Sequence, residues 1–140
     1  MYYVNREQID LRLKALPDVA DALEALAAGW RGTVLQGLAQ ERALHLAVEI
    51  VTDVGSYLID GFIMRDASSY EDIIEIIGEE GVFPAERKEP LAGLVRLRKP
   101  LVQDYWQWDR AELHPLTPRL PDVLRAFRRD VEAYLERELG

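Results

Sequence analysis

One segment of the 140-residue chain combines residue types that could carry out chemistry: Arg98-Lys-Pro-Leu-Val-Gln103-Asp-Tyr105-Trp-Gln-Trp108. Apolar residues recur at helical spacing before and within it, and at about 100° per residue they place Arg98 near the centre of an apolar face. A charge left unpaired in a dry interior costs several kcal/mol or more. We therefore expect Arg98 either to have a carboxylate partner or to line a cleft.

The candidate partner is Asp53. It belongs to a polar stripe that runs beside the apolar face of a predicted helix, and the stripe consists of Arg42, Glu49, Asp53, Ser56 and Asp60. A bidentate pair between Asp53 and Arg98 would satisfy both charges and fix the orientation of the guanidinium group. Two interpretations stay open at this point: a salt bridge that only locks two helices together, or a pair that leaves Arg98 facing a cleft.

The run around Arg98 resembles the motif of the HepT-like branch of the HEPN superfamily, which is an arginine, four residues, a histidine, one residue and a tyrosine. Arg98 and Tyr105 match this pattern, and the position of the histidine is the one departure. Residues 49–60, with the acidic Asp53, are similar to the family's second helix, and residues 60–70 to its link to a short third helix. The resemblance covers nearly the whole chain and implies an all-α, HEPN-like antiparallel bundle that forms a homodimer.

The resemblance also implies a toxin-type, metal-independent ribonuclease that needs no cofactor. In this activity Arg98 steadies charge on the phosphorus oxygens, Asp53 orients it, and the motif histidine moves protons near neutral pH. Gln103 stands in place of that histidine and cannot gain or lose a proton. General acid–base catalysis typically contributes about a hundred- to ten-thousand-fold in rate. We therefore expect a ribonuclease or its weakened descendant, or alternatively a non-catalytic dimeric module that binds nucleotides or RNA, which Gln103 favours on mechanistic grounds.

Tyr105 falls on the same side of the predicted helix as Arg98, about 20° away. The residues alone are compatible with a core tyrosine whose hydroxyl group bonds to an acidic side chain. By resemblance, Tyr105 is the site that a small partner nucleotidyltransferase, the antitoxin, modifies with AMP, provided that its hydroxyl group reaches solvent.

The charge pattern bears on nucleic-acid binding in two ways. The formal net charge of −8 argues against broad electrostatic attraction to RNA. Residues 66–89 hold eight acids against two basic residues, so this segment carries −6 of the −8 and leaves about −2 for the rest. Arg96, Arg98 and Lys99 form a local basic cluster that could bind a nucleotide or RNA, although a solvated charged surface is the simpler interpretation.

Other candidate sites are weaker. His45, Glu49 and Asp53 follow one another at four-residue spacing, which places them on one helical face, but no second helix supplies an obvious ligand pair, so we expect no metal site. His114 precedes a proline in a predicted turn and is expected at the surface. The aromatic residues at 105–108 could stack on bases, or cover a core or a dimer interface.

The composition bounds the class of protein. A length of 140 residues predicts one domain, residues 1–140, and the absence of cysteine excludes disulfides and thiol nucleophiles. The start of the chain lacks the basic and apolar pattern of a signal peptide, and no long uncharged apolar run is present. We therefore expect a cytoplasmic protein without a membrane segment.

About five helices must position these residues. Helical periodicity, caps and prolines predict them over residues 6–28, 33–62, 68–81, 84–108 and 121–139. Pro17 is expected to kink or break the first helix, and Pro100 to bend the fourth so that Arg98 and Gln103 come closer together. No convincing strand or repeat is found, so the expected architecture is an antiparallel helical bundle.

Overall fold

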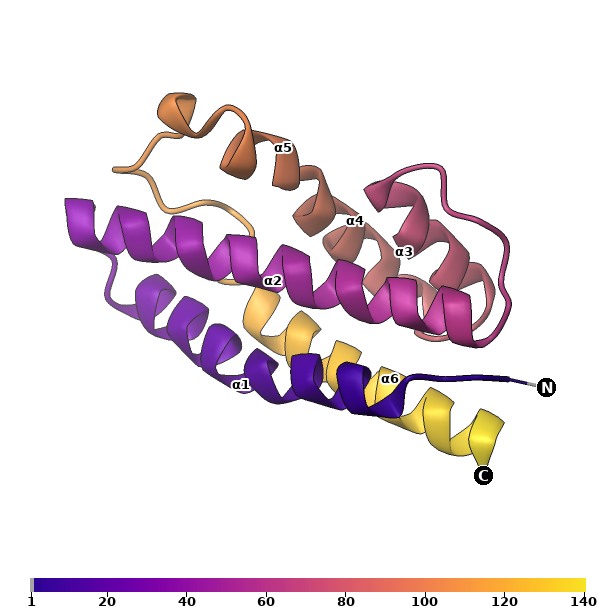
Figure 1. The fold of residues 1–140 in the computed structure, drawn as a ribbon. Helices are drawn as coiled ribbons and strands as arrows, with labels where there is room; N and C mark the ends of the chain where they lie inside the picture. The colour runs from indigo at the N-terminus through magenta and orange to yellow at the C-terminus, as the bar shows by residue number, and fades with distance from the viewer. Residues whose placement is uncertain (1) are drawn as a thin grey trace.

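The computed structural model describes residues 2–140, and no strand occurs among them, so the expected all-α fold is confirmed (Figure 1). The α-helices are α1 (Arg6–Ala28), α2 (Val34–Gly61), α3 (Tyr70–Glu79), α4 (Lys88–Arg96), α5 (Arg98–Val102) and α6 (Leu120–Leu139), with short 3₁₀ helices η1 (Ala85–Arg87) and η2 (Tyr105–Gln107). The long α2 runs through the middle, with α1 and α6 on one side of it and α3, α4 and α5 on the other.

Side-chain caps fix the starts of the first three helices. Asn5, Thr33 and Ser69 each accept a hydrogen bond from a main-chain N–H group in the first turn that follows. These bonds satisfy donors that have no partner inside a helix. The cap of α3 is Ser69 rather than Ser68, because Ser69 binds the N–H group of Asp72 at 3.0 Å.

The predicted fourth helix, 84–108, is wrong as one element: it is divided into η1, α4, α5 and η2. Pro90 and Pro100 explain the division, since each is the third residue of a new α-helix. A proline is tolerated in a first turn because its missing N–H group would have no intrahelical partner there. By contrast, α1 continues through Pro17 without a break.

A shared apolar core holds the bundle: all six α-helices contribute buried side chains, and the fully buried ones include Leu44, Ile74, Leu94 and Phe127. Gly55 lets α3 pack closely on α2, since a Cβ atom at this position would collide with Ile73. This close packing brings the start of α3 next to α5. None of the helices in residues 2–140 combines the length and apolarity needed to span a bilayer.

Candidate active site

Arg98 is the first residue of α5, directly after the break at Leu97 that separates α5 from α4. Main-chain hydrogen bonds continue on both sides of this break. The N–H group of Leu97 donates to the carbonyl of Leu94, and the N–H group of Leu101 donates to the carbonyl of Leu97. Only 27% of the Arg98 side chain is exposed. The expectation of a largely enclosed guanidinium group is therefore correct.

Three groups define the environment of this guanidinium group. Its central carbon lies 4.1 Å from the centroid of the Tyr70 ring at the start of α3, a cation–π contact. Its Nε atom lies 3.6 Å from Oε1 of Glu49 on α2, which is within ion-pair range but too long for a hydrogen bond. Within residues 2–140, Arg98 Nε is the one buried side-chain nitrogen or oxygen atom that has no hydrogen-bond partner.

The expected pair between Asp53 and Arg98 is wrong. Asp53 Oδ2 accepts a hydrogen bond from Nε of Arg12 at 3.2 Å, and Arg12 also stacks on Tyr57. The reason is that α1 packs along α2, so that Arg12 on α1 lies next to the Asp53 carboxylate. Glu49, one helical turn earlier on the same polar stripe, is the acidic residue that faces Arg98.

His45 lies beside this pair, which the sequence interpretation did not anticipate. Its Nε2 atom is 3.3 Å from the same Glu49 Oε1 atom that faces Arg98. Its Nδ1 atom is 3.4 Å from Nη1 of Arg42. The four-residue spacing predicted that His45 and Glu49 share one face of α2, but it could not indicate that Arg98 meets Glu49 there.

This face of α2 does not form a metal site. Asp53 is engaged by Arg12, and Glu49 lies between His45 and Arg98. No group of three or more histidine, aspartate or glutamate side chains in the described chain is arranged to hold a cation.

Gln103 follows the last residue of α5. Its main-chain N–H group donates to the carbonyl of Lys99 at 2.8 Å, while its side chain is exposed and makes no hydrogen bond within residues 2–140. The structure therefore does not join Gln103 to Arg98. Because a glutamine amide does not titrate, proton transfer at this site needs another group.

Tyr105 and Trp106 are surface residues of η2. Their side chains are 56% and 66% exposed, and their rings meet edge to face at 5.7 Å. The interpretation of Tyr105 as a core residue is wrong, and its exposure meets the condition set for a modification site. Trp108 differs, because it is partly buried against the core and stacks on His114 at 5.6 Å.

The three residues of the basic cluster, Arg96, Arg98 and Lys99, differ in whether a carboxylate compensates their charge. Arg96 binds Glu71 at 2.8 Å and Glu89 at 3.3 Å, so its charge is compensated. Hydrogen bonds to these two carboxylates raise the pKa of Arg96. Lys99 is exposed beside Arg98. Arg98 and Lys99 are thus the members of the cluster with capacity for a phosphate.

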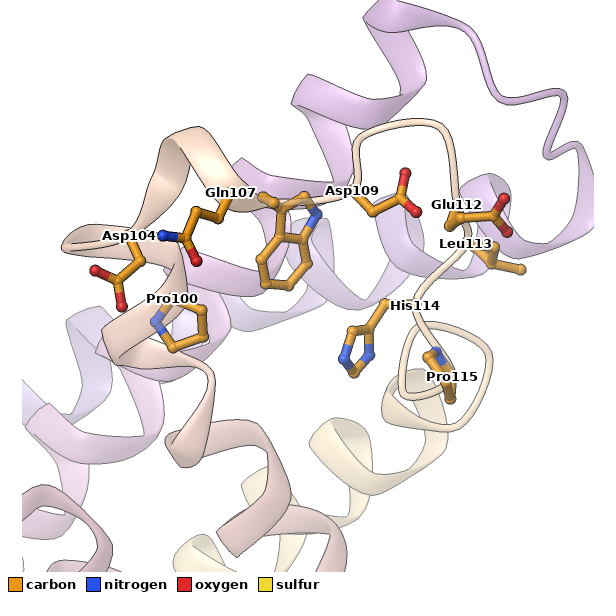
Figure 2. A pocket seen from close by; sticks show the side chains of 9 residues that line it. Pro100, Asp104, Gln107, Asp109, Glu112, Leu113, His114 and Pro115 are labelled. Atoms are coloured by element: carbon orange, nitrogen blue, oxygen red, sulfur yellow. The ribbon is translucent and has the colours of Figure 1, made fainter.

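A cavity of about 320 Å³ opens beyond Pro100, between η2 and the segment that leads to α6 (Figure 2). Trp108 and His114, whose rings stack on each other, both line the cavity. The acidic residues Asp104, Asp109 and Glu112 also line it. His114 is half-buried rather than fully exposed, and this burial lowers its pKa. Its Nδ1 atom accepts the N–H group of Leu116 at 3.0 Å. The three carboxylates make this cavity unfavourable for a phosphate group.

A buried amide holds this segment on α2. The side chain of Gln40 has no exposed surface; its oxygen accepts hydrogen bonds from the N–H group of His114 at 2.8 Å and the hydroxyl group of Thr117 at 2.7 Å. Its nitrogen donates to the carbonyl of Glu112 at 3.1 Å. Arg110 also pairs with Glu41. No sequence pattern indicated this anchor, because glutamine at a helical position is usually exposed.

The chain and its fold are similar to those of known proteins. The model of the family described as "Ribonuclease HepT-like" matches residues 14–130. A Bacillus subtilis (strain 168) protein named "Putative RNase YutE" is 37% identical over 140 residues, covering 100% of this chain and 96% of its own length. A solved structure, "Structure of Cytosolic Protein of Unknown Function YutE from Bacillus subtilis", superposes with a TM-score of 0.90 at 35% identity, again over 100% of this chain and 96% of that one.

Proposed function

Because the chain belongs to the HepT-like ribonuclease family of the HEPN superfamily, we propose that it is a metal-independent endoribonuclease that cleaves RNA at Arg98. The observation that carries the proposal is the state of the Arg98 guanidinium group. It is held by the Tyr70 ring and faces Glu49, yet its buried Nε atom has no hydrogen-bond acceptor within residues 2–140. A phosphate group would supply the missing acceptor.

The geometry around Tyr70 supports access for a substrate. A surface hollow of about 240 Å³ is lined by residues 67–70 and Ile73, so the ring that stacks on Arg98 also faces open space. Lys99, the residue after Arg98, is exposed and adds a second positive charge that can attract a phosphodiester backbone.

We place the protein in a toxin–antitoxin pair, with a small nucleotidyltransferase as its antitoxin. The partner would transfer AMP from a nucleoside triphosphate to the Tyr105 hydroxyl oxygen and release pyrophosphate. The exposure of Tyr105 supports this assignment. Tyr105 follows Arg98 by seven residues, so a bulky anionic group there would oppose the binding of RNA phosphates by repulsion.

We also propose a cytoplasmic homodimer as the working form. Three large apolar side chains at the start of α2, Val34, Leu35 and Leu38, are 70%, 78% and 48% exposed. The 3₁₀ helix η2, which carries the exposed Trp106, lies at the same end of the bundle as the start of α2 (Figure 1). Exposed apolar groups that gather at one end are typical of an interface between subunits.

The test is cleavage of end-labelled single-stranded RNA by the purified protein in the presence of a metal chelator. We expect cleavage by the wild type and its loss in Arg98→Ala. Arg129→Ala is the matched control, because Arg129 is an exposed arginine on α6, remote from the groups around Arg98.

One observation favours a second function, a non-catalytic module that binds nucleotides or RNA. Gln103 cannot move a proton, and its side chain is not joined to Arg98. If folded wild-type protein binds RNA through Arg98 but leaves it intact, this second function replaces the first.

A further inference from the structure

The absence of a histidine at position 103 leaves few groups in this chain that can move a proton near neutral pH. The sequence has no cysteine and two histidines, His45 and His114. His114 lies by the acidic cavity beyond Pro100, with its Nδ1 atom engaged by the Leu116 N–H group. His45 is the histidine that shares a contact with Arg98, through Glu49.

The three side chains meet at one oxygen atom. Glu49 Oε1 lies 3.3 Å from His45 Nε2 and 3.6 Å from Arg98 Nε, so the two nitrogen atoms are at most 6.9 Å apart. Two N–H···O bonds of about 2.9 Å to one phosphodiester group span a similar distance. Each side chain is partly exposed: 31% for His45, 37% for Glu49 and 27% for Arg98. Each of the three side chains therefore has surface that a substrate can reach.

We propose that Glu49 is the general base and His45 the general acid of RNA cleavage at Arg98, in place of the motif histidine. This inference rests on the proposed ribonuclease function and names the residues that carry out its proton transfers. The carboxylate of Glu49 lies within reach of both His45 and Arg98 and can accept a proton, and an imidazolium can donate one near neutral pH.

In the step we infer, the 2′-oxygen of the substrate forms a bond to phosphorus while the bond from phosphorus to the 5′-oxygen breaks. The 2′-hydroxyl proton passes to Glu49, and the 5′-oxygen receives the proton that His45 holds on Nε2. The products are a 2′,3′-cyclic phosphate and a 5′-hydroxyl group. Arg98 donates hydrogen bonds to the non-bridging oxygens as charge develops on them.

The separation of the two groups also explains how the site returns to its starting state. After cleavage Glu49 carries a proton and His45 is neutral. Because Oε1 and Nε2 lie 3.3 Å apart, the proton can return from the carboxyl group to the imidazole. No metal ion or further reactant enters this balance.

Other charged and titratable groups surround His45. Arg42, on α2, faces its Nδ1 atom, and Glu49 faces its Nε2 atom. Arg98 from α5 and Tyr70 from α3 lie beyond Glu49, and Arg12 from α1 is paired with Asp53 one turn farther along α2. Arg42 is exposed and can turn away when Nδ1 also carries a proton.

The test is the pH dependence of RNA cleavage by the wild type and by single variants, with a chelator present. We expect a bell-shaped profile, because the reaction needs an ionised carboxylate and a protonated imidazole. His45→Gln should lose about a hundredfold or more in rate together with the alkaline limb, and Glu49→Gln should lose the acidic limb. His114→Gln, the matched control at the other histidine, should keep the wild-type profile.

The outcomes separate this inference from the function on which it rests. Cleavage that needs Arg98 but is unchanged in rate and pH profile by His45→Gln overturns the inference and leaves the ribonuclease function intact. No cleavage by folded wild-type protein overturns both.

A second measurement does not depend on activity or on the folding of a variant. We expect the His45 Cε1–H resonance of the wild type to shift on addition of a 2′-deoxy oligonucleotide, which cannot be cleaved by this route, while that of His114 stays in place. A His45 resonance that does not move when the oligonucleotide binds would also overturn the inference.

Discussion

Replacement of Gln40 by leucine should cause the largest loss of stability among substitutions of polar residues in the chain. Leucine is similar in volume but apolar, so the N–H group of His114, the hydroxyl group of Thr117 and the carbonyl of Glu112 would all lose their partner. A polar group left unsatisfied in the interior costs about 1–3 kcal/mol. With three such groups, and with some relief from water at the partly buried ones, we expect the free energy of unfolding to fall by about 3 kcal/mol.

The assay is urea denaturation of the wild type, Gln40→Leu and Gln103→Leu, where Gln103 is an exposed glutamine with no side-chain hydrogen bond in the described chain. The control should lie within about 0.5 kcal/mol of the wild type. Thr117→Val should add less to Gln40→Leu than it costs alone, because the two residues share one bond. A loss below about 1 kcal/mol for Gln40→Leu, at an unchanged dependence on urea, would refute the view that this amide anchors the segment.

Four further predictions concern the site and its surroundings. Tyr70→Leu should weaken RNA binding about fivefold through loss of the cation–π contact while Tyr70→Phe keeps it, as measured by fluorescence anisotropy. Gln103→His should raise the rate of RNA cleavage, and an unchanged rate at matched folding would contradict a weakened nuclease. Burial lowers the pKa of His114 below its ordinary 6.5, so near this pH the unfolded chain binds more protons than the folded protein. The free energy of unfolding should therefore fall as the pH is lowered from 7.5 to 5.5, and it should fall less in His114→Gln. Leu35→Asp should convert a dimer to a monomer in sedimentation equilibrium, whereas a wild type that is already monomeric would contradict the proposed interface.

The fold was predictable because its signals are local. Caps such as Thr33 and apolar periodicity mark where α1, α2 and α6 begin and end to within a residue or so. The division of the fourth predicted helix was missed because Pro90 was placed inside one continuous helix and Pro100 was expected only to bend it. Their places in the first turns of new helices depend on how α4 and α5 pack against α2 and α3.

The site was predictable in part. The position of Arg98 on an apolar face correctly indicated that a group on another helix must face it. Which carboxylate does so could not be read from α2 alone, since the choice between Glu49 and Asp53 is made by Arg12 on a different helix. His45 was missed for the same reason: its relation to Arg98 passes through Glu49 and needs the packing of α5 on α2.

The ion pairs of the acidic segment that follows α2 compensate only part of its charge. Three of its carboxylates are paired: Asp72 with Arg65 at 2.8 Å, Glu75 with Lys88 at 2.7 Å and Glu71 with Arg96 at 2.8 Å. The hydrogen bond from Arg65 is the main cause that holds the pKa of Asp72 well below its usual range. These pairs join α3 to its neighbours, but Lys88 is already counted in the −6 of residues 66–89, so Arg65 and Arg96 reduce the local charge only to about −4.

The same pairs help to decide between the two interpretations of Arg98. Where an arginine of this chain has a structural role, its guanidinium group makes hydrogen bonds, as Arg87 does with both oxygens of Asp130 at 2.5 and 3.3 Å. Arg98 is as enclosed as Arg87, with 27% and 24% of their side chains exposed, yet it makes no hydrogen bond within residues 2–140. An enclosed guanidinium group without an acceptor is unfavourable for stability alone. This arrangement favours a site that is completed by the phosphate of a substrate.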